Sequence, residues 1–257
     1  MPACRRIVLS SLVVSTLLLG ACGAPPRPPP WEAGKEEPAA ASSVLPADPE
    51  AAFTALQERL LAARSIELAV EVESSQPYPS LLTGTLTLRS GNQLELAVDG
   101  KFTDQSVNLR LKSAGGRLVG GPHGQGDKTI DQRTPPALGE AVVIGLMGMG
   151  LLHNLALLSS GMPPDHAAGG AASWVVTSEH TWDTGRDATI DGRATRALGF
   201  QISVEGQNVG DATLWLDAAT GLPVKREVRV HFSGESDGSA SGTMRVSETY
   251  LKFEVSP

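Results

Sequence analysis

The sequence has little of three things on which many folds and functions depend: cysteine, aromatic residues and an excess of positive charge. Its 257 residues include 2 cysteines, 4% aromatic residues, and 21 Lys and Arg against 28 Asp and Glu. Cys4 and Cys22 both precede the body of the chain, so neither a disulfide framework nor a cysteine metal site can hold the fold. The acidic balance excludes nucleic-acid binding, because a polyanion would be repelled. The fold must therefore rest on an apolar core.

Residues 1–21 have the composition of a secretory signal. Arg5 and Arg6 form a basic start, and an apolar run follows from Ile7 to Leu19. This run is too short for an ordinary membrane-spanning helix. Its removal leaves 19 basic and 28 acidic side chains, a net charge of about −9.

The segment Leu19-Gly20-Ala21-Cys22 resembles the bacterial lipobox. The resemblance implies that Cys22 becomes the new N-terminus and carries a lipid anchor, since two or three acyl chains hold a protein firmly on a membrane where one does not. It also implies a place in the bacterial cell envelope, facing the periplasm. Gly23 replaces the aspartate that some bacteria use for inner-membrane retention, which slightly favours the outer membrane. The alternative is a plain signal followed by an incidental cysteine.

The chain is expected to divide into the signal at 1–21, a tether at 22–49 and one domain at 50–257. The tether is rich in Pro, Ala, Glu and Ser and has no periodic apolar face, which predicts disorder. The domain opens with a helix. Asp48 can cap it, Pro49 suits its first position, and apolar residues recur at helical spacing as far as about Arg64.

Strict alternation of apolar and polar residues then predicts a run of strands. Ile66, Leu68, Val70 and Val72 alternate with polar residues, the period of a strand with one face in water. The same pattern recurs at 82–88, 94–98, 107–111, 174–179, 186–190, 198–204, 212–216, 228–232 and 244–255. Short connections, at Ser90-Gly91-Asn92 and near Asp99-Gly100, favour antiparallel hairpins. A change of phase near Glu248 to Tyr250 predicts a β-bulge.

Two other segments break the strand pattern. Residues 115–136 are dominated by Gly, Pro and charge, which favours a loop. Leu138 to Leu158 is almost wholly apolar and predicts a helix buried against the sheet, with a membrane span as the alternative. Glycines at 145, 148 and 150 beside Met147 and Met149 favour a helix that can move or yield space.

Two turn motifs carry a resemblance to a known family. Residues 210–225 read GDATLWLDAATGLPVK, which places Trp215 and Asp217 before a Thr-Gly-Leu-Pro turn. Upstream, Ile190-Asp191-Gly192 forms a turn that leads into the strand preceding residues 210–225. With the order helix, strands, apolar helix, strands, these motifs resemble the LolA/LolB lipoprotein-carrier superfamily and mycobacterial lipid-binding lipoproteins. Asp217, Gly221 and Pro223 are interpreted as turn-forming residues without a chemical role.

The residue pattern predicts an α+β fold with an antiparallel sheet of roughly eight to ten strands and helices inserted at two places. The resemblance implies that this sheet is curved into an open half-barrel with helices on its concave face. It also implies a hydrophobic ligand, a lipid or the acyl chain of another lipoprotein, carried by a monomer. The residues expected to contact it are inward-facing or lie on the apolar helix: Leu86, Leu96, Leu109, Met147, Met149, Phe200, Ile202, Leu214 and Val230. The alternative is a structural or interaction lipoprotein in which the same residues form a closed core.

No motif supports an enzyme. The stretch from Gly121 to Thr129 approaches a phosphate-binding loop, but Asp127 stands before Lys128 and would repel phosphate. The five histidines never occur at zinc-motif spacing, and serine-hydrolase motifs are missing. We therefore expect no catalytic residue, no cofactor and no metal, with an envelope hydrolase as a third possibility.

Overall fold

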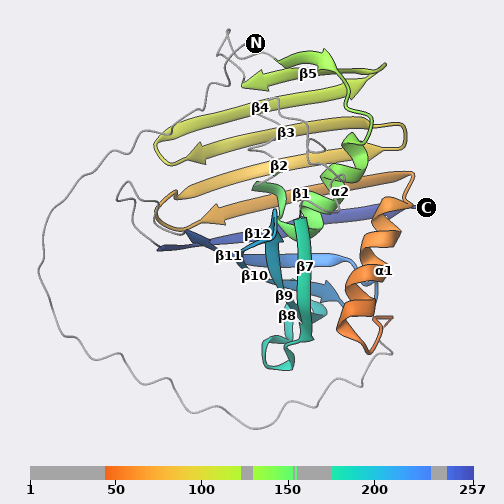
Figure 1. Cartoon of the computed structure of the whole chain (residues 1–257), viewed down its shortest axis with the longest axis vertical. Coiled ribbons are helices and arrows are strands. Elements are labelled where there is room, and N and C mark those ends of the chain that lie inside the picture. The colour runs from red at the N-terminus through yellow and green to blue at the C-terminus, as the bar shows by residue number, and fades with distance from the viewer. Residues whose placement is uncertain (1–43, 123–129, 153, 155–174, 233–241) are drawn as a thin grey trace, which may run out of the picture.

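A single curved antiparallel sheet dominates the computed structural model, which describes residues 44–122, 130–152, 154, 175–232 and 242–257 (Figure 1). The twelve strands follow the order β6-β5-β4-β3-β2-β1-β12-β11-β10-β9-β7, with β8 also paired to β9. Their bounds are β1 Ser65–Ser74, β2 Ser80–Arg89, β3 Gln93–Phe102, β4 Gln105–Ala114, β5 Arg117–Pro122, β6 Ile130–Arg133, β7 Val175–Trp182, β8 Ala188–Ile190, β9 Arg193–Val204, β10 Gln207–Asp217, β11 Pro223–Phe232 and β12 Gly242–Ser256. The sheet is open, because its end strands β6 and β7 are not paired with each other among the described residues. This confirms the predicted fold class.

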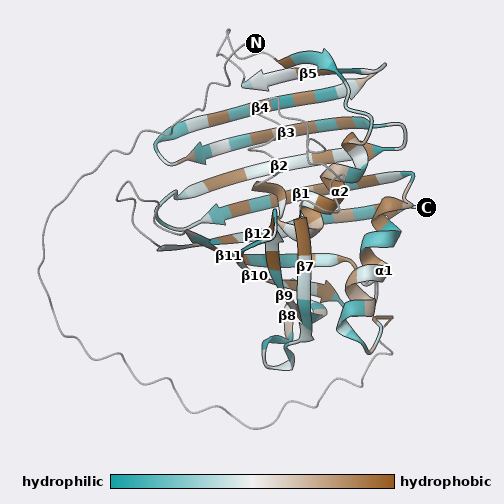
Figure 2. Cartoon of the chain, in the orientation of Figure 1, coloured by the Kyte–Doolittle hydropathy of each residue, from teal (hydrophilic) through white to brown (hydrophobic). Residues whose placement is uncertain are grey.

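The sheet consists of two meanders joined at its middle. Strands β1 to β6 each pair with their sequence neighbour, as do β9 to β12, and the first strand pairs with the last along nearly its whole length. Figure 2 shows apolar and polar residues alternating along the strands, so one face of the sheet is apolar. The helices lie on that concave face.

Helix α1 (Pro49–Leu61) begins where the sequence predicts and ends three residues before Arg64. The Asp48 carboxylate accepts a hydrogen bond from the Ala51 N–H at 2.8 Å, which caps the helix. The residues just before it also contact the domain: the Val44 N–H donates to the Ala218 carbonyl at 3.1 Å, and the Trp182 indole donates to the Ala47 carbonyl at 2.8 Å. The last part of the predicted tether is thus attached to the sheet.

Helix α2 (Leu138–Gly148) is shorter than the predicted helix at 138–158. It is capped at Met149, and Gly150 then adopts a φ of 85°, which interrupts the helix before helical backbone resumes at Leu151. Residues 155–158 lie outside the described residues. Nine of the eleven residues of α2 are buried, as expected for a helix packed on a sheet. Within the described ranges, no helix is both long and apolar enough to span a membrane.

Two expectations about the connections are wrong. The Gly-rich stretch at 115–136 contains β5 and β6, so the sheet has twelve strands and not eight to ten. At Gly120 the backbone of β5 approaches the backbone of β4 so closely that a Cβ would meet the carbonyl oxygen of Arg110. This pairing requires glycine and leaves no alternation of apolar and polar residues in the sequence. Gly100 likewise lies inside β3, opposite Leu82, and the chain turns only after Phe102.

The predicted turn and bulge near the C-terminal half are both present. The Asp217 carboxylate accepts from the N–H groups of Ala219 and Thr220 at 2.7 and 3.2 Å, and Gly221 has a φ of 69°, which confirms their role in the turn. The change of phase in β12 falls at Leu251, one residue beyond the predicted range, because Ala69 pairs with Lys252 while Val70 pairs with Tyr250. Leu251 is 58% exposed as a result.

Candidate ligand-binding site

The residues predicted to contact a ligand lie together on the concave side of the sheet. Seven of the nine are at most 4% exposed and belong to one apolar core: Leu86, Leu96, Leu109, Met147, Phe200, Ile202 and Leu214. Met149 and Val230 are partly buried and pack against that core. None of the nine lines either of the two clefts described next. The structure therefore brings the predicted residues together, but covers them with protein.

A cleft of about 330 Å³ opens between the end of α1, the start of α2 and the adjoining ends of β1 and β2. We call this the helix cleft. Leu60, Ile66, Leu88 and Val143 line it, and all four also belong to the apolar core. Its volume is at the lower end of the range of small-molecule sites, about 300–1,000 Å³. Arg89, Ser90 and Glu140, which are exposed, also line the cleft, so buried apolar side chains and exposed polar ones meet at this opening.

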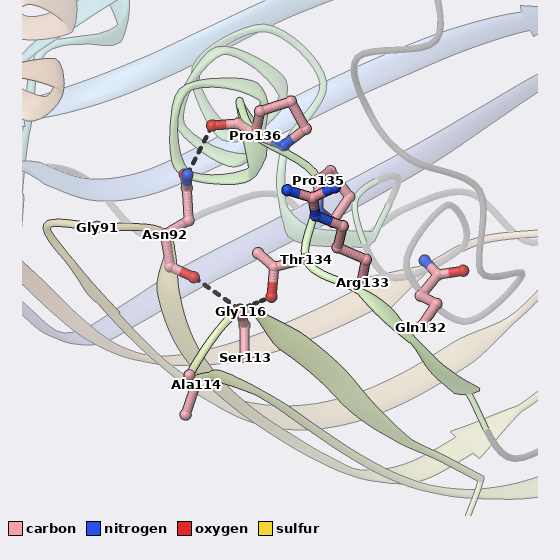
Figure 3. Close-up of a pocket in the computed structure, with 11 residues that line it drawn as sticks. Gly91, Asn92, Ser113, Ala114, Gly116, Gln132, Arg133, Thr134, Pro135 and Pro136 are labelled. Carbon is pink, nitrogen blue, oxygen red and sulfur yellow. Dashed lines mark hydrogen bonds between the residues drawn. The ribbon is translucent and has the colours of Figure 1, made fainter.

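A second cleft, of about 730 Å³, adjoins the first and shares Gly91 and Asn92 with it. We call it the rim cleft. Its other lining residues come from the end of β4 and the β4–β5 turn, and from the end of β6 and the chain that leads to α2: Ser113, Ala114, Gly115, Gly116, Gln132, Arg133, Thr134, Pro135 and Pro136. Figure 3 shows Asn92 on one side of this cleft, between Pro136 and Ser113.

Asn92 ties three elements together at the junction of the two clefts. Its side-chain amide donates to the Pro136 carbonyl at 2.6 Å (Figure 3) and accepts from the Gly139 N–H at 2.8 Å. Its backbone carbonyl accepts from the Ser113 hydroxyl at 2.7 Å. Helix α2 has no side-chain cap of its own, so Asn92 supplies the bond that its N-terminus lacks.

A polar cluster lies under the other end of α2. Arg226 on β11 and Glu248 on β12 are directly opposite each other across the two strands, and each is 1% exposed. The Arg226 Nη2 donates to the Met147 carbonyl at 2.6 Å. The Glu248 carboxylate accepts from the Leu151 N–H at 2.5 Å and from the Tyr250 hydroxyl at 2.8 Å. These contacts join the end of α2 to the floor of the half-barrel.

Several polar atoms of this region have no partner. Among the described residues, neither Nε nor Nη1 of Arg226 makes a hydrogen bond, and neither does Oδ1 of Asn154. Burial raises the pKa of Tyr250 well above its usual value, and the adjacent Glu248 carboxylate acts in the same direction, while the nearby Arg226 guanidinium opposes the rise in part. Tyr250 is therefore a neutral hydrogen-bond donor to Glu248 at all ordinary pH values.

One histidine also faces the core. The ring of His180 on β7 lies 4.7 Å from that of Phe53 on α1 and 5.9 Å from that of Phe200 on β9. Burial lowers the pKa of His180, and the carboxylates of Glu50 and Asp48 oppose this shift only in part. The uncharged ring thus helps α1 pack on the sheet.

Sequence reasoning missed Asn92, Arg226 and Glu248. A signal for the last two is present in the sequence, because each stands at an inward position between apolar residues: Arg226 between Val224 and Val228, and Glu248 before Tyr250. Two opposite charges in the buried phase of neighbouring strands predict an internal pair. No comparable pattern marks Asn92, whose role depends on where α2 begins.

Some predicted features lie outside the described residues. They include the signal, the anchor at Cys22, most of the tether, and His123, His153 and His166. Within the part of the chain that is described, no group of three His, Cys, Asp or Glu side chains is placed to hold a metal ion.

Comparison with known proteins gives only distant matches. No protein-family model matches the sequence, and no curated protein matches it. Among solved structures, LprF from Mycobacterium bovis matches with a TM-score of 0.43 and 12% identity over 80% of this chain and 93% of that chain. A LolA superfamily protein from Nitrosomonas europaea matches with a TM-score of 0.30 and 9% identity over 81% of this chain and 94% of that one. A chain of the Pseudomonas aeruginosa MucA/MucB complex matches with a TM-score of 0.36 and 16% identity over 80% of this chain and 58% of that one. These names include the superfamily that the turn motifs resemble, while any assignment of function rests on this chain's own residues.

Proposed function

We propose that this chain is a lipid-anchored protein of the bacterial envelope that binds an acyl chain between the concave face of its sheet and α2. Cys22 would carry the anchor, and the nine residues predicted from the sequence, on the strands and on the apolar helix, would contact the ligand. The bound molecule would be a lipid or the acyl group of another lipoprotein, carried or sorted at the membrane.

The observation that carries this proposal is that buried apolar side chains line the helix cleft. Leu60, Ile66, Leu88 and Val143 are at most 7% exposed, yet they line an opening to solvent. An alkyl chain that enters here passes exposed polar residues, among them Arg89 and Glu140, and then meets these buried apolar side chains. Each methylene it buries contributes about 0.8 kcal/mol, so a chain of about twelve carbons gains on the order of 10 kcal/mol before ordering costs.

The attachment of α2 supports a helix that can give way. Its contacts with the sheet are apolar over most of its length, and polar side chains hold it at its two ends: Asn92 at the start, and Arg226 and Glu248 near the end. A ligand chain can replace apolar contacts with equivalent ones, because such contacts have no direction. Displacement of α2 would then require only a few polar contacts to break.

The burial of the predicted residues favours a second function. If α2 never leaves the sheet, the core is closed and the chain is a structural or interaction lipoprotein. A hydrolase has less support: the buried cluster has no serine, cysteine or histidine to act as a nucleophile or base, and Glu248 already accepts hydrogen bonds from α2 and Tyr250.

The test is to narrow the helix cleft. Ala63 lines this cleft, whereas its neighbour Ala62 is exposed and does not. We expect Ala63→Trp to weaken binding of diphenylhexatriene, a fluorescent hydrocarbon, by about tenfold or more, and Ala62→Trp to leave binding unchanged. Native mass spectrometry of the wild-type chain is expected to show a co-purified lipid. If the wild-type chain neither binds the hydrocarbon nor carries a lipid, the closed-core function is correct.

A further inference from the structure

The strongest unexplained feature of the interior is the guanidinium of Arg226. It has five N–H donors on three nitrogens, and its side chain is 1% exposed. Nη2 bonds to Met147, while Nε and Nη1 make no hydrogen bond in the described part of the chain. The guanidinium also lies near the Tyr250 hydroxyl and opposes the rise in the pKa of that group. A buried donor without an acceptor is unfavourable, and native proteins rarely leave one unpaired.

The location of these donors suggests an acceptor from outside the chain. Arg226 stands at an inward position of β11 between Val224 and Val228, so it faces the same concave side as the core. Met147, to which it bonds, is one of the residues expected to contact a ligand. A chain that displaced the end of α2 would therefore come next to free N–H groups.

The charge of the cluster limits the chemistry of that acceptor. Both carboxylate oxygens of Glu248 are engaged, one by the N–H groups of Leu151 and Leu152 and the other by the Tyr250 hydroxyl. Its charge balances that of Arg226 on the opposite strand. A ligand carboxylate would add a second, uncompensated negative charge in a buried site, whereas an uncharged carbonyl oxygen would accept a hydrogen bond at no such cost.

We propose that Arg226 binds the carbonyl oxygen of an uncharged acyl ester, through its free Nε and Nη1 groups, when the acyl chain lies on the concave face. This inference rests on the acyl-binding function proposed above and adds a chemical selectivity to it. The site distinguishes esters from ethers, which lack the carbonyl, and from free fatty acids, which are charged.

The experiment compares two lipids that differ only in that carbonyl. A diacylglycerol and the dialkylglycerol with the same chains each compete with diphenylhexatriene for the full-length chain. We expect the diester to displace the probe at about ten- to a hundredfold lower concentration than the diether, the effect of a hydrogen bond from a charged donor. At pH 8 the methyl ester of a fatty acid is likewise expected to bind at least about tenfold more tightly than the free acid.

A charge-neutral double variant links the selectivity to this site. Arg226→Met with Glu248→Gln removes both buried charges together, which avoids leaving one unpaired. We expect it to keep binding diphenylhexatriene and to bind diester and diether equally. The control is Lys112→Met with Glu95→Gln, an opposed pair on exposed positions of β3 and β4, which should keep the preference for the ester.

Each other outcome has a definite meaning. If the probe binds but the wild-type chain shows no preference for the ester, water satisfies Arg226 and this inference is wrong while the acyl-binding function stands. If neither the probe nor the lipids bind, both are wrong. If the double variant does not fold, NMR of the Arg226 Nε–H in the wild-type chain decides: its resonance should shift with the diester and not with the diether, and equal shifts overturn the inference.

Discussion

The attachment of α2 at Asn92 gives the sharpest test of how the half-barrel is closed. Asn92→Gly removes both side-chain hydrogen bonds, to Gly139 and to Pro136, and keeps the backbone φ of 59° without strain. Each such bond contributes about 0.5–1.5 kcal/mol, so we expect a loss of about 2 kcal/mol in the free energy of unfolding. That corresponds to a decrease of about 4–8 °C in melting temperature for a domain of this size.

The assay combines thermal unfolding with amide hydrogen exchange. Exchange of the Gly139 amide and the first turn of α2 should become faster, whereas the amides of β12 should keep their relative protection. Asp191→Gly is the control, because Asp191 also has a positive φ, of 48°, but its carboxylate lies 3.9 Å from its nearest cation, Arg193. This substitution should change the stability by less than about 0.5 kcal/mol.

Two results would refute the reasoning. One is a melting temperature of the Asn92→Gly variant within about 1 °C of the wild type, together with unchanged exchange at Gly139. The other is an equal loss in Asp191→Gly, which would assign the effect to glycine itself. Faster association of diphenylhexatriene with Asn92→Gly would in addition connect the attachment to ligand uptake.

Three further predictions concern the interior and the anchor. Gly150→Ala should lower the free energy of unfolding by about 3 kcal/mol or more, because a Cβ there would lie 2.5 Å from the Glu248 carboxylate. The control Gly192→Ala has a similar φ but lies in open space, so it should cost only about 1 kcal/mol. Equal losses of the two variants in denaturant unfolding would contradict this. The pKa of His180 is lower in the folded than in the unfolded state, so the unfolded state binds the proton first as the pH falls, and the stability from the neutral ring is present above about pH 6.5 and lost below it. His180→Gln should therefore reduce the difference between the melting temperatures at pH 8 and pH 5. An unchanged difference would show that another group is responsible. Labelled palmitate should enter the wild-type chain and Cys4→Ala but not Cys22→Ala, and labelling of Cys22→Ala would place the anchor elsewhere.

The strands that could be predicted from the sequence are those with a strong periodic pattern. The alternation at Ile66 to Val72 and the cap at Asp48 depend on neighbours in the sequence, and both elements form where expected. In β5, Gly120 lies against the backbone of β4, and the short strand β6 pairs only with β5, so neither strand has an apolar period to detect. The end of α2 was overestimated because an apolar run continues through Gly150, where only the backbone conformation changes.

The candidate site was predictable in its apolar part only. Inward positions such as Leu86 and Leu214 follow from alternation, and the structure brings them into one core. The polar contacts that hold α2 depend on tertiary geometry, since Arg226 is 79 residues from Met147 and Glu248 is 97 residues from Leu151. A sequence pattern can show that a charge is buried, but not which backbone group it will meet.

Because β1 pairs with β12, the middle of the sheet can form only when synthesis of the domain is almost finished. The two meanders adjoin along this one seam, which joins strands from opposite ends of the domain. During synthesis the strand β1 of the first meander stays unpaired on one edge until the fifteen residues of β12 are available. Contacts between such distant parts of a chain form slowly. We therefore expect a premature stop codon just before β12 to yield an aggregating or degraded product, even though most of the core side chains would still be present.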